Sequence, residues 1–397
     1  MNTYYFDNGA TTKVKDEVLL EMMPYLKEEY GNPSALYSIA RSSRKAVENA
    51  RQKVANLINA KKQEIYFTSC GTEADNTALK GIAYLNKKQG NHIITSKIEH
   101  PAILDTCKFL EKQGYDITYL NVDENGFINL NELRNSIKNK TILISIMFAN
   151  NEIGTIEPIE DIAKIAKEKN IIFHTDAVQA VGNVEIDVKK LGIDMLSLSG
   201  HKIYAPKGIG ALYVREGIDF EKFLNGGHQE NNKRAGTENV AGIVGLGKAS
   251  ELSKSNLKEH RYKIKNLRDY YIYKVRERIP NIKINGAINA RLPGNANFSF
   301  PGIKGRDLLL ELDNVGICAS SGSACSSKNS NPSHVLQAIG LNEEQIESAI
   351  RITFGDFNTK EEIDFLVSNI EIAVNKLINN TYNNLWTMLE DRKLNNV

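Results

Sequence analysis

Cysteine is scarce in this sequence: it has four cysteines in 397 residues, and none of them forms a Cys-x-x-Cys pair. A disulfide framework is therefore excluded, and no metal site is indicated. Long hydrophobic runs are missing too, because the most apolar stretch, residues 142–149, falls far short of the ~20 residues of a membrane span. The first residues have no basic start and no long apolar stretch, so we expect no secretion signal.

A surplus of one charge is also absent. The 50 Lys and Arg residues nearly balance the 48 Asp and Glu residues, and the formal net charge is +2. This balance argues against binding to nucleic acid through a general attraction to phosphate. Hydrophobic residues make up 41% of the chain, which is typical of a protein with a full core. We therefore expect a soluble cytoplasmic protein of roughly two or three domains, with neither membrane nor nucleic acid as a direct partner.

Short apolar runs alternate with helical patterns through the first two thirds of the chain. Several runs are apolar throughout, as strands covered on both faces are. Residues 44–59 and 158–169 carry apolar stripes at helical spacing between them. This alternation predicts an α/β fold with a mostly parallel sheet and helices on both faces. The predicted strands are residues 64–68, 92–95, 117–120, 141–147, 171–174, 195–198 and 210–214.

The pattern changes after about Ala249, where a long charged helical stretch runs to about Arg278 and ends at Pro280. Beyond it, helices and strands no longer alternate regularly, and a final helix opens with a capping box at Thr359. This predicts a large domain of residues 15–255 and a smaller α+β domain of residues 1–14 and 256–397. The elements expected in that second domain are strands 297–300 and 349–354, helix 306–313 and a Gly/Ser-rich segment at 319–333.

Two polar residues directly follow predicted strands. Lys202 comes after strand 195–198, among small residues, and Asp176 comes after strand 171–174. Each has an ordinary explanation when taken alone, as a solvated lysine and as a turn or cap residue. Ligands of open α/β sheets, however, bind at the carboxyl ends of strands. Together the two residues indicate pyridoxal 5′-phosphate (PLP), which binds a lysine as a Schiff base and pairs its ring nitrogen with an acid.

A third segment indicates a phosphate site. Gly71 and Thr72 follow a predicted strand and precede a helix that includes Asn76. The free N–H groups at the start of a helix bind anions, so this turn suits the phosphate of such a cofactor. An ordinary N-cap at Thr72 is the alternative.

A cysteine in a polar loop is the fourth feature. Cys325 lies among small polar residues, from Ser320 to Ser327, with little to pack against. A cysteine in such a loop is a candidate nucleophile or carrier, whereas an incidental exposed thiol is the alternative.

Taken together, these features resemble the PLP-dependent cysteine desulfurases of the NifS/IscS type, which belong to the class-V aminotransferases of fold type I. The likeness runs from the segment that starts at Phe6 to the final helix, over almost the whole chain. Its motifs occur in the same order as in the family: Gly71-Thr72-Glu73, Glu99-His100-Pro101, Asn150-Asn151-Glu152-Ile153-Gly154, Asp176 with Gln179, Ser199-Gly200-His201-Lys202, Arg234-Ala235-Gly236-Thr237-Glu238-Asn239, and residues 320–326.

The resemblance implies a PLP site. Lys202 would form the Schiff base, Asp176 would pair with the ring nitrogen and Gln179 with the ring oxygen. His100 would stack on the ring, as an acid/base or only as structural support, and Asn151 would lie near both cofactor and substrate. The phosphate would be bound by Gly71, Thr72, Ser199, Gly200 and His201, and by Thr237 of the neighbouring subunit in a homodimer.

The resemblance also implies a reaction. Arg351 would bind the carboxylate of L-cysteine, Lys202 would move the Cα proton, and Cys325 would take the sulfur as a persulfide, which leaves alanine. Residues 319–333 would form a mobile catalytic loop, as in one subgroup. An iron–sulfur scaffold protein or a thiolation relay would accept the sulfur, and Cys325 is a possible transient ligand of a cluster. The tail at residues 380–397, with Leu385-Trp386-Thr387-Met388-Leu389, would bind the scaffold or pack on its own domain.

Some positions depart from the family pattern. Tyr37 stands where histidine is usual, Cys70 where glycine is common, and residues 226–232 replace a more usual glycine-rich run. Two other PLP activities stay open, a transaminase and a selenocysteine lyase. A transaminase has no need for Cys325, and an inactive scaffold protein would have no need for Lys202 and Arg351.

Overall fold

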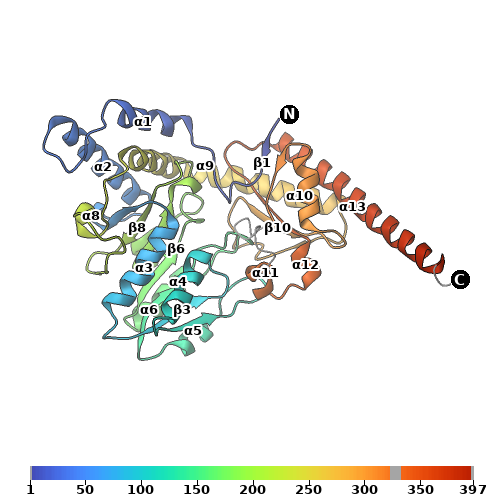
Figure 1. The fold of residues 1–397 in the computed structure, drawn as a ribbon, viewed down its shortest axis with the longest axis horizontal. Helices are drawn as coiled ribbons and strands as arrows, with labels where there is room; N and C mark the ends of the chain where they lie inside the picture. Colours follow the sequence, from blue (N-terminus) through green and yellow to red (C-terminus); the bar gives the residue numbers. More distant parts are fainter. Residues whose placement is uncertain (1, 322–331, 395–397) are drawn as a thin grey trace.

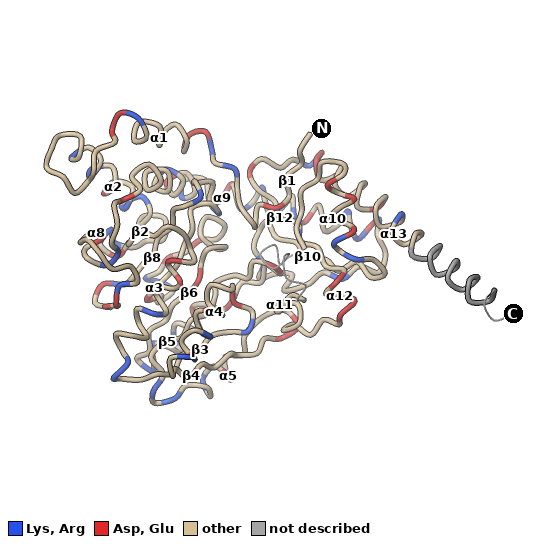
Figure 2. Tube along the Cα trace, viewed as in Figure 1, with Lys and Arg blue, Asp and Glu red and all other residues tan. Residues whose placement is uncertain are grey.

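The computed structural model describes residues 2–321 and 332–394, and it describes side chains up to residue 380. Two bodies lie side by side in Figure 1, a larger one built on a central sheet and a smaller one that contains the N-terminus. Helix α9 (Val240–Arg278) runs from the larger body into the smaller one, and α13 (Lys360–Leu394) extends away from the smaller body (Figure 1). Basic and acidic residues are interspersed along both bodies (Figure 2), in keeping with the small net charge.

The central sheet contains all seven of the predicted strands, and no bound differs from its prediction by more than two residues. Their order in the sheet is β2-β8-β7-β6-β5-β3-β4. Strand β8 is antiparallel to both of its neighbours, and the other pairs are parallel. The strands are β2 (Ile65–Thr68), β3 (His92–Ser96), β4 (Asp116–Leu120), β5 (Thr141–Ser145), β6 (Ile172–Asp176), β7 (Met195–Ser199) and β8 (Gly210–Val214).

Both faces of this sheet are buried, because successive strand residues enter two different hydrophobic clusters. Ile93 and Met195 belong to one cluster, whereas the adjacent Ile94 and Leu196 belong to the other. Side chains alternate along a strand, so a run that is apolar throughout needs a cover on each side. Helices α3 (Gly71–Leu85) and α4 (Pro101–Glu111) pack in the first cluster, and α2 (Ser38–Leu57), α6 (Ile159–Glu168) and α9 pack in the second.

The helix α9 begins nine residues earlier than the charged pattern after Ala249 suggests. Asn239 caps it by accepting a hydrogen bond from Gly242 N at 3.1 Å. Its first turns are buried and rich in glycine, so they show no polar face. A Cβ on Gly247 would lie 2.6 Å from Ala50 Cα on α2, which means that glycine permits the close packing of these two helices.

The smaller body has its own core, which joins both ends of the chain. Phe6 packs there with Tyr271 of α9 and with Phe298 and Ile350 of an antiparallel sheet. The domain boundaries given above stay a prediction. The strands of this body are β1 (Tyr4–Tyr5), β9 (Lys283–Ile284), β10 (Asn295–Ser299), β11 (Ile317–Cys318) and β12 (Ala349–Thr353), and its short helices are α10 (Gly305–Asp313), α11 (His334–Ala338) and α12 (Glu343–Glu347).

The remaining helices lie at the edges of the larger body. They are α1 (Asp16–Lys27), α5 (Leu130–Ser136), α7 (Val188–Leu191) and α8 (Gln229–Asn232). Within residues 2–321 and 332–394, no helix is both long and apolar enough to cross a membrane.

Candidate active site

A cavity of about 300 Å³ lies where the carboxyl ends of β6 and β7 meet the start of α3 and the N-terminal segment. The cavity brings together residues predicted from widely separated motifs: Gly71, Thr72, His100, Asn151, Asp176, Gln179, Ser199, His201, Lys202 and Arg351. Of the other predicted residues, Gly200 is buried beside the cavity, Thr237 is exposed outside it, and Cys325 lies outside the described residues.

The N-terminal segment forms the wall of the cavity next to Lys202. The Lys202 ammonium donates hydrogen bonds to Gly9 O at 2.6 Å and to Ala10 O at 2.8 Å. Gln179 Nε2 also donates to Gly9 O, at 3.0 Å. Lys202 follows β7 in a short 3₁₀ turn, so the strand end and these two carbonyl groups together fix where its side chain points.

Asp176 ends strand β6 at the bottom of the cavity. One of its carboxylate oxygens accepts a hydrogen bond from Val178 N at 2.9 Å. Burial raises the pKa of Asp176, and the nearby His100 and Lys202 oppose that rise. A buried carboxylate of this kind is stabilised by a positive partner, which a protonated ring nitrogen would supply.

His174, two residues before Asp176 on β6, has a structural role. His174 is hydrogen-bonded to Ser145 Oγ at 2.9 Å and to Ser197 Oγ at 3.0 Å, and it is fully buried. Burial lowers the pKa of His174 to about 3, so the ring is neutral at physiological pH.

His100 lies at the N-cap of α4, and its tautomer follows from one contact. Its Nδ1 accepts a hydrogen bond from Ala102 N at 3.1 Å, so in the neutral ring the proton is on Nε2. Burial lowers the pKa of His100, and the positive charge of Lys202 lowers it further, against the opposite effect of Asp176. The ring is therefore a neutral imidazole in a cavity that also contains an ammonium group.

The start of α3 forms a cradle that fits a phosphate group. Cys70 stands at the N-cap without a side-chain cap, so the first N–H groups of this 15-residue helix are available to an anion. A Cβ on Gly71 would lie 2.6 Å from Val178 Cγ2, so only glycine leaves the turn open. Ser199 Oγ is buried and has no hydrogen-bond partner among the described residues. An unsatisfied buried hydroxyl beside an uncapped helix start fits a phosphate ligand.

An ion pair and a backbone hydrogen bond support this cradle. Glu73 accepts hydrogen bonds from Ser69 N at 2.8 Å and from Arg234 Nε at 2.9 Å. Arg234 precedes Thr237 in the same loop, so the loop that carries Thr237 is tied to the start of α3.

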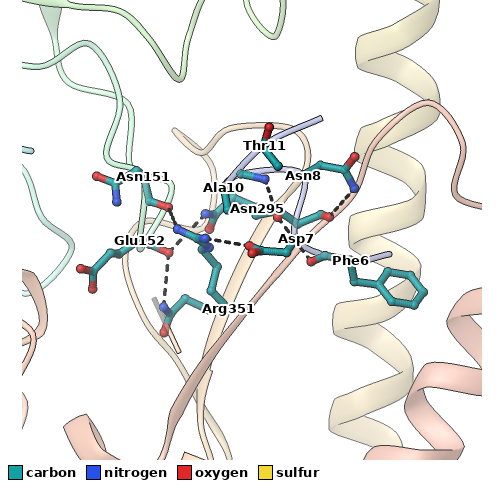
Figure 3. A network of polar contacts seen from close by, with 12 residues as sticks. Phe6, Asp7, Asn8, Ala10, Thr11, Asn151, Glu152, Asn295 and Arg351 are labelled. Carbon is teal, nitrogen blue, oxygen red and sulfur yellow. Dashed lines mark hydrogen bonds and ion pairs between the residues drawn. The ribbon is translucent and has the colours of Figure 1, made fainter. Parts of the chain in front are cut away.

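Arg351 enters the cavity from β12 in the smaller body. Its side chain is 2% exposed, and it donates hydrogen bonds to Asn151 O and to the Asp7 carboxylate, each at 2.8 Å (Figure 3). Asn295 Nδ2 supports the segment that contains Asn151, because it donates a hydrogen bond to Glu152 O at 3.2 Å (Figure 3). The cavity thus has a fixed guanidinium group on the side opposite the central sheet, of the kind that binds a carboxylate.

Three cavity or near-cavity residues were not singled out from the sequence. Asp7 lies in the segment that starts at Phe6, but nothing in its neighbourhood indicates a partner 344 residues away. Asp75 of α3 lines the cavity, and burial together with the nearby Asp176 raises its pKa well above the usual value. His334 lines the cavity and donates from Nε2 to Glu99 O at 3.0 Å. No local motif marks either of the last two.

The positions that depart from the family pattern lie at different places. Tyr37 is 54% exposed at the start of α2, whereas Cys70 lines the cavity. Glu230 holds segment 226–232 in place, because its carboxylate forms a bidentate ion pair with Arg51 at 2.6 and 2.7 Å.

Comparisons with known proteins agree with this geometry. The profile of the family "Aminotransferase class-V" matches residues 4–366. A cysteine desulfurase IscS of Clostridium botulinum is 56% identical over 365 residues, which cover 91% of this chain and 92% of that protein. One from Methanosarcina thermophila is 53% identical over 375 residues, covering 94% and 93%.

Solved structures share the fold at similar coverage. A NifS-like protein superposes with a TM-score of 0.90 at 38% identity, over 95% of this chain and 100% of that one. SspA in complex with cysteine superposes with a TM-score of 0.80 at 37% identity, over 90% and 100%. This chain therefore belongs to the class-V aminotransferase family, within its NifS/IscS type. Members of this family depend on PLP, and the residues around the cavity fit that cofactor.

Proposed function

We propose that this chain is a PLP-dependent cysteine desulfurase, which converts L-cysteine to L-alanine and passes the sulfur on. The observation that carries the proposal is the convergence of Lys202, Asp176, His100 and Arg351 on one cavity. The curated relatives named above have this activity, and the SspA neighbour binds cysteine.

The residues of the cavity divide the work of binding. Lys202, Asp176, Gln179 and the cradle at Gly71 would hold PLP, which supplies an electron sink for the bonds at the substrate Cα. Arg351 would bind the substrate carboxylate with two parallel N–H groups. His100 Nε2 and Lys202 Nζ are the groups in the cavity that would exchange protons with the substrate.

Cys325 would receive the sulfur. The bond from the substrate Cβ to its sulfur breaks, a sulfur–sulfur bond to Cys325 forms, and the two-electron reduction at Cβ balances the oxidation of the thiol to a persulfide. No external oxidant is needed. Described residues on either side of the segment support this role, because Ser320 pairs with Arg351 through the backbone and Ser333 Oγ donates to Glu152 at 2.6 Å. Both flanks of residues 322–331 thus contact residues that line the cavity.

The partners follow from the same proposal. Thr237 is exposed and outside its own cavity, which supports a homodimer in which it reaches the phosphate of the neighbouring site. We propose an iron–sulfur scaffold protein, or another sulfur acceptor, as the recipient of the persulfide in the cytoplasm. The scaffold-binding prediction for Leu385–Leu389 falls on side chains outside the described residues.

Product analysis tests the proposal. Purified protein is incubated with L-cysteine and a thiol reductant, and sulfide, alanine and the cofactor spectrum are followed together for the wild type, Cys325→Ala and the control Cys318→Ala. We expect equal amounts of sulfide and alanine from the wild type and Cys318→Ala. Cys325→Ala should still change the cofactor spectrum with cysteine but release almost no sulfide. Alanine or keto-acid formation that ignores the Cys325 change would instead favour a transaminase or a lyase.

A further inference from the structure

Asp7 holds Arg351 from the far end of the chain. Its Oδ1 accepts a hydrogen bond from Arg351 Nη2 at 2.8 Å, and the two side chains are 17% and 2% exposed. The N-terminal segment that carries Asp7 runs beside β12, where Asp7 forms a bridge with Thr353 (Figure 3). The contact therefore joins the first residues of the chain to the last strand of the smaller body.

The backbone around Asp7 is fixed by several hydrogen bonds. Asp7 O accepts from Ala10 N at 2.9 Å and from the Tyr5 hydroxyl at 3.1 Å. Gly9 N donates to Thr353 Oγ1 at 2.7 Å. The backbone that carries the Asp7 carboxylate is thus held beside Arg351, so Asp7 is placed to support the guanidinium before a ligand arrives.

Two separate segments orient the guanidinium group. Asp7 accepts from Nη2, and Asn151 O accepts from Nη1. Contacts at both terminal nitrogens fix the plane of the guanidinium, and the charge of Asp7 compensates a cation that is almost fully buried. Without Asp7, Arg351 would lose the charge of this carboxylate and the contact at Nη2.

We propose that Asp7 is the positioning residue that holds Arg351 ready for the carboxylate of an amino-acid substrate. The inference rests on the proposed function, in which Arg351 binds that carboxylate. Asp7 acts through Arg351 and does not itself touch the substrate. It should therefore affect carboxylate binding strongly and the chemical step little.

The test uses 3-mercaptopropionate, which has the thiol and carboxylate of cysteine but no amine to react with the cofactor. Its dissociation constant is measured by calorimetry on the PLP-loaded protein for the wild type, Asp7→Ala, Asp7→Asn, Arg351→Ala and the double variant Asp7→Ala/Arg351→Ala. Asp116→Ala is the control, because it removes an aspartate from an exposed ion pair with Lys138 of 2.6 Å outside the cavity. Turnover of L-cysteine is measured in parallel, and unfolding temperatures and PLP content show that each variant is folded and loaded.

We expect Asp7→Ala to weaken 3-mercaptopropionate binding about tenfold or more, since the charge-assisted contact that orients Arg351 is lost. Asp7→Asn keeps the accepting oxygen and should stay within about threefold of the wild type. In the Arg351→Ala background, Asp7→Ala should have no further effect. For L-cysteine the KM should rise while kcat changes less than about threefold.

Two results would overturn the proposal. One is wild-type binding by Asp7→Ala, and the other is an undiminished effect of Asp7→Ala in the Arg351→Ala background. A wild-type protein that releases no sulfide from L-cysteine would defeat the proposed function instead. The calorimetric coupling between Asp7 and Arg351 would still be measurable in that case.

Discussion

The ion pair between Arg51 and Glu230 allows a stability prediction with an internal control. Arg51 donates to both oxygens of Glu230, at 2.6 and 2.7 Å, and Phe67 N donates to the same carboxylate at 2.8 Å. The same guanidinium also contacts Glu48 at 3.0 Å. The side chain of Glu230 is 3% exposed, whereas that of Glu48 is 44% exposed. One cation thus has a buried partner and a solvated partner.

Glu230→Gln should destabilise the fold far more than Glu48→Gln. Removal of one partner of a buried pair leaves an uncompensated buried charge, and such changes cost about 3–5 kcal/mol. Glutamine keeps one accepting oxygen, so we expect a value near the lower limit, about 3 kcal/mol. An exposed pair contributes about 1 kcal/mol or less, which sets the expected cost of Glu48→Gln. Glu230 has a φ of 49°, but glutamine has the same backbone preference, so strain cancels in the comparison.

Urea unfolding followed by circular dichroism measures both variants against the wild type at equal PLP content. The free energy of unfolding should fall by about 2 kcal/mol more for Glu230→Gln than for Glu48→Gln. If the two variants agree within about 0.5 kcal/mol, burial does not decide the strength of these pairs and the reasoning is refuted.

Three further predictions concern the site and its support. Gly71→Ala places a Cβ 2.6 Å from Val178 Cγ2 and should weaken PLP binding at least about tenfold in a titration of the apo-protein. For Asp356, burial raises the pKa but the hydrogen bond from His260 helps to lower it from 3.8 to about 2. Asp356→Asn should therefore cost about 2 kcal/mol of unfolding free energy at pH 6, a difference that shrinks as the pH falls from about 4 toward 2. Because the pKa of His100 is lowered, kcat/KM should lose no activity to protonation of this histidine until the pH is below 6.5.

Each of these has a clear contrary result. Unchanged PLP affinity in Gly71→Ala would mean that the cradle adapts to a methyl group. Urea unfolding measures the stability difference between the wild type and Asp356→Asn. A difference that stays constant between pH 6 and pH 3 would contradict the lowered pKa of Asp356. An acidic limb above pH 6.5 that disappears in His100→Gln would show that this histidine titrates above its ordinary pKa.

Much of the larger body could be predicted from the sequence because the strands of its sheet are buried on both faces. The runs that became β5 and β7 are almost completely buried, and polar residues of the site follow the end of β7. Parallel strands bring such ends to one edge, so the predicted proximity of Asp176 and Lys202 was confirmed. The role of Gly71 in a phosphate site could also be predicted, because Gly71 stands between a predicted strand and a predicted helix.

Other features depend on contacts that no local pattern contains. The start of α9 was predicted too late because a buried glycine-rich turn has no polar face. Asp7 comes to Arg351 through a pairing with the distant Thr353, and His334 lines the cavity where it contacts Glu99 O. A sequence window shows what a residue is but not which distant strand its segment will join.

The position of Asp7 beside β12 has a consequence for synthesis of the protein. The N-terminal segment is made first, whereas Arg351 and Thr353 are added only when about nine tenths of the chain has been made. Until then the carbonyls of Gly9 and Ala10 can meet Lys202, but the side of the cavity that contains Arg351 does not exist. A nascent chain arrested before β12 should thus be able to assemble the larger body without Arg351, the residue that we propose binds the substrate's carboxylate.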